Sequence, residues 1–102
     1  MLDENWTPVN FAAINCRIMP RLPSLLPQWL PNGEWRGNEW CALNPTRDDR
    51  RLGSFLINRV TGFWGDFATG DTGGDPISLY AYIRGLKQPE AARDLQCMLG
   101  GW

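Results

Sequence analysis

Residues 53–75 constrain the fold of this chain more than any other part of it. Two short runs of aromatic and branched residues, 54–58 and 63–67, lie on either side of Val60-Thr61-Gly62. Aromatic and branched residues favour strands, and Gly62 can supply the positive φ angle of a tight turn. The pattern therefore predicts a β-hairpin.

The residues after this hairpin predict a loop followed by two helices. Residues 69–74 are too polar and glycine-rich for a strand, and Asp75 and Pro76 then offer an N-cap and a first-turn proline. Gly85 suits the C-terminal end of that helix. A last helix opens at residues 87–90, which place a proline and an acid in its first turn.

The N-terminal third predicts helices interrupted by prolines, followed by a change to strands. Thr7 and Pro8 offer a helix start, and Pro20 is expected to end or kink that helix. A second, shorter helix is expected over residues 21–30. Two short strands separated by a turn are then predicted within residues 34–43.

These segments predict one α+β domain over residues 1–102. A helical N-terminal segment is expected at 1–31, a small antiparallel sheet of three or four strands at 32–67, and two C-terminal helices at 75–99. A chain of 102 residues with 43% hydrophobic and 21% charged residues is typical of a folded single domain.

Composition excludes several classes of function. The chain has no histidine, which removes the commonest general base and metal ligand, so we expect neither an enzyme nor a cofactor nor a small-molecule substrate. Its net charge of −1 provides no overall basic field for nucleic acid. The widely spaced Cys16, Cys41 and Cys97 and the lack of a membrane-length apolar run predict a cytoplasmic protein with reduced, buried thiols and no membrane contact.

A series of motifs is collinear with a known family. The series runs from about Asn38 to Leu99 and comprises Gly53-Ser54-Phe55, an asparagine before a turn, an aromatic strand, Gly73-Gly74-Asp75, an apolar helix, Gly85-Leu86 and Pro89-Glu90-Ala91-Ala92. This order resembles the zinc-ribbon domain of bacterial and phage DNA primases. Residues 44–47 and 67–71 also resemble the leading segment of primase-helicases of phages and mobile elements. The resemblance implies a domain that precedes a polymerising domain, binds zinc and helps to select single-stranded template.

The zinc ligands that the resemblance implies are missing. Cys41 falls near the first ligand position, but Asn44 stands where its partner is expected, and the second pair would fall at Phe67 and Gly70. A structural zinc site needs four thiolate or imidazole ligands, so we expect a metal-free ribbon. Five aromatic side chains are expected to organise the sheet in place of zinc: Trp40, Phe55, Phe63, Trp64 and Phe67.

Arginines and tryptophans form the first candidate binding site. Arginine beside exposed aromatic rings is typical of proteins that bind single strands. The candidates are Arg36, Arg47, Arg50, Arg51, Arg59, Trp35 and Trp64. In the alternative interpretation, these arginines pair with Glu39, Asp48 and Asp49 in a solvated loop and the tryptophans lie in the core.

Two functions follow as expectations. The resemblance implies a non-catalytic primase accessory module of a phage or mobile element, which binds single-stranded DNA or a primase or helicase domain. If the chain is complete, the alternative is a small phage protein that binds and inhibits a host factor, such as a CRISPR-type defence complex. Its candidate contacts are the acidic residues Asp66, Asp71 and Asp75, where we expect no metal because the loop matches no calcium-binding pattern.

Overall fold

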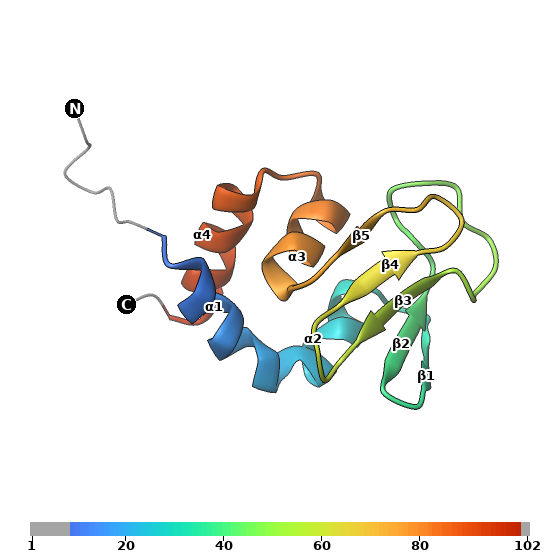
Figure 1. Cartoon of the computed structure of the whole chain (residues 1–102), viewed down its shortest axis with the longest axis horizontal. Helices are drawn as coiled ribbons and strands as arrows, with labels where there is room; N and C mark the ends of the chain where they lie inside the picture. The colour runs from blue at the N-terminus through green and yellow to red at the C-terminus, as the bar shows by residue number, and fades with distance from the viewer. Residues whose placement is uncertain (1–8, 101–102) are drawn as a thin grey trace.

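A five-stranded antiparallel sheet and four α-helices form the described part of the chain, residues 9–100, in the computed structural model (Figure 1). The strands pair in chain order. They are β1 (Glu34–Arg36), β2 (Glu39–Ala42), β3 (Phe55–Asn58), β4 (Trp64–Asp66) and β5 (Thr72–Gly73). The helical segments are α1 (Phe11–Ile18), the 3₁₀ turn η1 (Met19–Arg21), α2 (Leu22–Trp29), α3 (Pro76–Arg84) and α4 (Gln88–Met98).

The predicted α+β class, with helices from both ends of the chain packed against an antiparallel sheet, is confirmed. The sheet has one strand more than expected, because Thr72 and Gly73 pair with Gly65 and Trp64. The Thr72 hydroxyl also donates a hydrogen bond to the Trp64 carbonyl at 2.7 Å. The segment whose polar, glycine-rich composition predicted a loop therefore contains a two-residue edge strand.

The turn and cap signals around the sheet are confirmed. Gly37 and Gly62 adopt φ angles of 61° and 80° in the β1–β2 and β3–β4 turns. Asp75 caps α3 by accepting a hydrogen bond from the Ser78 amide at 2.8 Å, and Gly85 ends α3 in the left-handed conformation. These sites obey local backbone rules that act over a few residues.

The N-terminal helices follow their prolines. Thr7 and Pro8 lie outside the described residues, and within them Asn10 caps α1 by accepting a hydrogen bond from the Ala13 amide. Pro20 lies in the 3₁₀ turn between α1 and α2, as a proline that interrupts a helix should. Among residues 9–100, no helix is long and apolar enough to cross a membrane.

Helix α1 contacts the rest of the protein through one face, and Cys16 lies on a different face. Ile14 and Ile18 are fully buried, and the Asn15 side chain accepts a hydrogen bond from the Ile77 amide at 3.0 Å. Cys16 and Cys97 are exposed, so the expectation of buried thiols is wrong for both. In α1 the side chains turned toward the core are Ile14 and Ile18, and in α4, which carries Cys97, they are Ala91, Ala92 and Leu95.

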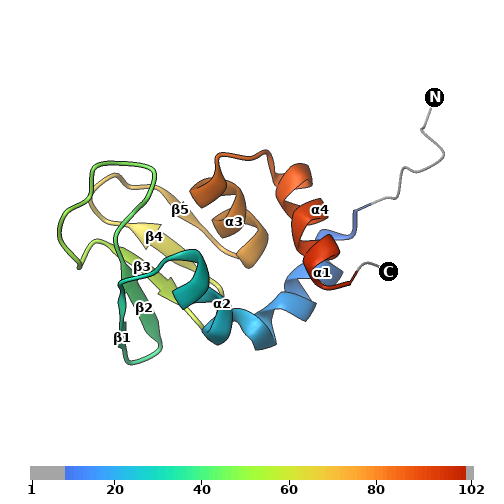
Figure 2. The same cartoon turned by 180° about the vertical axis from the view of Figure 1, so that it is seen from behind.

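Two tryptophans attach helices to the inner face of the sheet, where α2 lies (Figure 2). Trp40, Ile57 and Trp64 form one row across β2, β3 and β4. The Trp40 indole donates to the Leu30 carbonyl at the end of α2, and the Trp64 indole donates to the Ser78 hydroxyl of α3, each at 3.0 Å. Each ring thus buries apolar area while its N–H keeps a partner.

The close approach of Trp64 to β5 predicts a difference between two strand glycines. A methyl group at Gly73 would overlap the Trp64 indole and lie 2.6 Å from the Ser78 hydroxyl, whereas one at Gly65 meets only ordinary contacts of 3.5 Å or more. We expect Gly73→Ala to lower the free energy of unfolding by about 1–3 kcal/mol. Gly65→Ala, the matched control, should change it by less than about 0.5 kcal/mol. Urea denaturation followed by tryptophan fluorescence measures both, and equal losses would contradict this packing.

Candidate functional site

The outer face of the sheet carries no helix of the described chain: α2 lies behind the sheet in Figure 1 and in front of it in Figure 2. Successive side chains of a strand point to opposite faces of the sheet. Trp64 and Asp66 are buried on the inner face, so Phe63, Gly65 and Phe67 face outward. A hollow of about 500 Å³ lies on this outer face.

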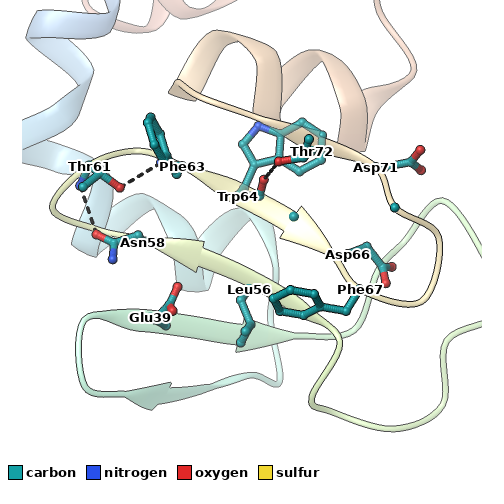
Figure 3. Close-up of a pocket in the computed structure, with 12 residues that line it drawn as sticks. Glu39, Leu56, Asn58, Thr61, Phe63, Trp64, Asp66, Phe67, Asp71 and Thr72 are labelled. Carbon is teal, nitrogen blue, oxygen red and sulfur yellow. Dashed lines mark hydrogen bonds between the residues drawn. The ribbon is translucent and has the colours of Figure 1, made fainter.

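Two phenylalanines flank this hollow, and a glycine forms part of its floor. Phe63 is 63% exposed and Phe67 is 82% exposed. Gly65 lies between them in the chain, and Leu56 lies opposite Gly65 in β3. Figure 3 shows the Phe67 ring extended across β3 toward Leu56, and Phe63 beside the β3–β4 turn. Exposed apolar side chains that gather around a surface hollow are typical of sites that contact a partner.

Phe67 is exposed but its backbone is fixed. Its amide donates to the Ser54 carbonyl at 2.8 Å, and the Asp66 carbonyl accepts from the Gly70 amide at 2.7 Å. The Asp66 amide donates in turn to the Asp71 carbonyl at 2.9 Å. The turn between β4 and β5 therefore fixes the backbone that carries the aromatic side chain, which lowers the entropy cost of ordering this segment on binding.

The Asp66 carboxylate anchors that turn from inside the protein. It accepts hydrogen bonds from Arg47 Nε at 2.9 Å, from Asn44 Nδ2 at 2.8 Å and from the Ala68 amide at 2.8 Å. Burial raises the pKa of Asp66, but these donors, Arg47 foremost, outweigh burial and lower the pKa to about 2. The carboxylate is therefore ionised near neutral pH.

Arg47 links this carboxylate to the loop between β2 and β3. Its guanidinium donates to the Ser54 hydroxyl at 2.8 Å and lies 3.3 Å from Asp49. The hydrogen bond to Asp66 raises the pKa of Arg47. Asn44, only 1% exposed, lies in the same loop, so the interpretation of residues 44–52 as a wholly solvated loop is wrong.

Tyr82 of α3 completes the polar network. Its hydroxyl accepts from Asn44 Nδ2 at 2.9 Å and donates to the Asp71 carboxylate at 2.7 Å. Every buried side-chain nitrogen and oxygen among the described residues has a hydrogen-bond partner. The network is thus a satisfied structural unit that connects the loop, the β4–β5 turn and α3.

No cation lines the hollow, and its acidic residues have neighbours of their own. The lining includes Glu39, Asp66 and Asp71 and no lysine or arginine. Arg47 neutralises Asp66, whose carboxylate is turned inward, and the Asp71 carboxylate accepts from the Tyr82 hydroxyl of α3. Glu39 lies opposite Arg36 in the register of β1 and β2. These three carboxylates therefore do not form a negative rim around the floor.

Three of the predicted binding residues lie at the β1–β2 turn, at one end of the sheet. Arg59 lies over the Trp35 ring, with 5.3 Å from Cζ to the ring centroid, and it also donates to the Asn38 side chain at 3.2 Å. Arg36 pairs with Glu34 at 3.3 Å, both side chains being exposed. This end is basic and aromatic, but it lies outside the hollow.

The other predicted arginines lie in the loop at the opposite end of the sheet, where Ala42 pairs with Phe55. Arg50 pairs with Asp48 at 2.9 Å on the surface, and Arg47 is held by Asp66. Arg51 is exposed in the same loop. The structure therefore separates the five arginines into two groups, and they do not form one basic face.

Several predicted contacts have structural roles. Trp64 is 6% exposed and cannot act as a stacking surface, Asp66 is buried, and Asp75 caps α3. Of the three acidic candidates, Asp71 is the one that is exposed. The sequence analysis did not identify Phe63 and Phe67 as surface residues. The alternation of side chains along residues 63–67 could have placed both on the face opposite to Trp64.

The residues at the implied zinc positions do not fit zinc. Cys41 is buried and is the one thiolate donor there, because Asn44, Phe67 and Gly70 offer no thiolate or imidazole. Among residues 9–100, no cluster of three or more cysteines, aspartates or glutamates could hold a metal ion. The prediction that five aromatic rings organise the sheet fails for the exposed Phe63 and Phe67, whereas the other three rings are buried.

Comparison with known proteins adds no assignment. No protein-family model and no curated protein matches this sequence. The functional argument therefore depends on the geometry and charge of the site.

The Asp66 network predicts a pH-dependent contribution to stability. We expect Asp66→Asn to lower the free energy of unfolding by about 2–4 kcal/mol near neutral pH, because it removes the buried carboxylate that accepts from both Arg47 and Asn44. The folded-state pKa of Asp66 is lowered to about 2, so the stabilisation is present above the unfolded pKa of about 4 and is lost as the pH falls toward about 2. Urea denaturation across this range should show the two proteins converging. Asp48→Asn, at the exposed pair with Arg50, is the control and should cost less than about 0.5 kcal/mol.

Proposed function

We propose that this chain is a non-catalytic binding module that engages a protein partner through the outer face of its sheet. The observation that carries this proposal is the hollow on that face, flanked by Phe63 and Phe67 at 63% and 82% exposure. Binding energy in protein interfaces is concentrated in a few aromatic anchors beside pockets. Here two such side chains stand on a fixed backbone.

The state of the ionisable groups supports a non-catalytic role. A carboxylate with a pKa of about 2, such as Asp66, is a poor general base near neutral pH. Its oxygens are already occupied by Arg47, Asn44 and the Ala68 amide. The chain also has no histidine to take over proton transfer.

The charge distribution favours a protein over single-stranded DNA as the partner. A groove that follows a nucleic-acid backbone is positively charged, whereas no lysine or arginine lines this hollow. The stacked pair of Trp35 and Arg59 lies at the far turn of the sheet and is separated from Arg47, Arg50 and Arg51 by the length of β2 and β3.

The resemblance to primase zinc-ribbon domains supplies a context for the partner. It is supported by the hydrogen bond between Asn44 and Asp66, which brings the two segments that would carry the zinc knuckles into contact. In that context the partner is a primase or helicase domain. For a chain that acts alone, the partner is a host protein such as a component of a CRISPR-type defence complex.

Photo-crosslinking from the hollow tests the proposal. With p-benzoylphenylalanine in place of Phe67, the full chain should form a covalent protein adduct in the cells that express it. The same group in place of Met98, which is 42% exposed on α4, is the control and should give none. Adding Gly65→Val to the Phe67 variant should remove the adduct while the fold is kept. A nuclease-sensitive adduct, or none, would refute a protein partner at this face.

A further inference from the structure

We infer from the structure that two copies of this chain associate through β1, which pairs with β1 of the second copy in an antiparallel, two-fold symmetric register. In that register Trp35 lies opposite Trp35 of the second copy, and Glu34 of each copy lies opposite Arg36 of the other. The inference adds a self-association surface to the proposed function. It does not depend on the hollow, whose floor lies on β3 and β4.

Strand β1 is an edge of the sheet that no other segment of residues 9–100 covers. It pairs with β2 alone, and no helix or strand lies beyond it in Figure 1 or in Figure 2. Its three residues are all exposed, with Trp35 at 38%. An uncovered edge strand presents unpaired N–H and C=O groups that can bond to a strand of another chain.

The register of the sheet shows which backbone groups of β1 are free. The Asn38 carbonyl accepts from the Arg59 amide at 2.9 Å, so the backbone groups of Asn38 point toward β3. Backbone direction alternates along a strand, so the groups of Glu39 point toward β1, where Glu39 is paired with Arg36. The amide and carbonyl of Trp35, the neighbour of Arg36 in β1, therefore point away from the sheet.

The charges of β1 specify the register of the pair. With Trp35 on the two-fold axis, the outward groups of the two Trp35 residues form two backbone hydrogen bonds, and Glu34 lies opposite Arg36 on each side of them. A shift by two residues would centre the pair on Glu34 or on Arg36 and place like charges opposite each other. Like charges directly opposite destabilise a pair of strands, whereas opposite charges stabilise it. The strand Glu34–Arg36 is therefore self-complementary in this antiparallel register.

The Trp35 ring supplies the apolar part of the interface. It lies on the same face as Trp40, its partner in β2, at 5.0 Å between ring centroids. It thus extends the row of Trp40, Ile57 and Trp64 to the edge of the sheet. In the pair, the two Trp35 rings form a cross-strand aromatic pair and bury area that a single copy leaves exposed. Because the interface is short, we expect a reversible dimer that depends on concentration.

Sedimentation equilibrium of the full chain over a range of concentrations measures this dimer. We expect Arg36→Glu to weaken it about tenfold or more, because the substitution turns both cross-strand charge pairs into like-charge pairs. Glu34→Arg should weaken it in the same way. An equal mixture of the two variants should restore the dimer as a heterodimer, since every cross-strand pair then joins opposite charges.

A charge reversal elsewhere on the surface is the control. Arg50→Glu, at the exposed pair with Asp48 in the loop between β2 and β3, should leave the dimer unchanged. The side chains of Glu34 and Arg36 are 54% and 50% exposed, so the two β1 variants should stay folded, which circular dichroism checks.

Isotope-filtered NMR of a mixture of labelled and unlabelled chain tests the register. The Cα atoms of a non-hydrogen-bonded antiparallel pair are about 4.5 Å apart, so we expect an intermolecular NOE between the Hα atoms of Glu34 and of Arg36 of the second copy. Protection of the Trp35 amide from hydrogen exchange should also rise with protein concentration.

Several outcomes overturn the inference. A monomer at every concentration would refute it, as would a dimer that both charge reversals leave unchanged or a mixture that associates no better than either variant alone. A dimer without the NOE between Glu34 and Arg36 would assign the association to another surface. A monomer that still gives a protein adduct from position 67 would refute the pairing of β1 and leave the binding module intact, whereas a dimer without an adduct would refute the module alone.

Discussion

The buried charge of Asp66 is the constraint on which the rest of the structure depends. A carboxylate removed from water is costly unless charged and neutral donors compensate it. Arg47 and Asn44 from the loop between β2 and β3, and the Ala68 amide from the β4–β5 turn, provide that compensation. Through Asn44 the same network reaches Tyr82 of α3. One ionised group therefore fixes three segments that are distant in the sequence.

This network also supports the candidate binding face. The turn that Asp66 anchors carries Phe67, which points outward while Asp66 itself points inward. An exposed aromatic side chain on a fixed backbone is suited to act as an anchor, since little backbone freedom remains to be lost on binding. The network lies where the resemblance to primase ribbons implies two zinc knuckles. In this chain, hydrogen bonds and an ion pair connect those two segments, and no zinc ligand set is present there.

The structure places at two ends of the sheet the arginines that the sequence analysis grouped into one candidate site. Arginines at 36 and 59 lie at one end of the sheet, and those at 47, 50 and 51 lie at the other. Between the two ends, the lining of the outer-face hollow includes Leu56 and Gly65 and no lysine or arginine. The arginines named here are therefore gathered at the ends of the sheet, and the hollow itself offers no cation to a phosphate.

The sequence by itself determined the α+β class, the hairpins, the caps of α3 and the breaks at Pro20 and Gly85. Each of these depends on backbone preferences acting within about four residues. Tertiary structure alone decided that Thr72 and Gly73 form a strand, that Arg47 pairs with Asp66, and that the phenylalanines at 63 and 67 stay exposed. Those outcomes require contacts between residues far apart in the chain, and composition cannot show which face of a strand a helix will cover.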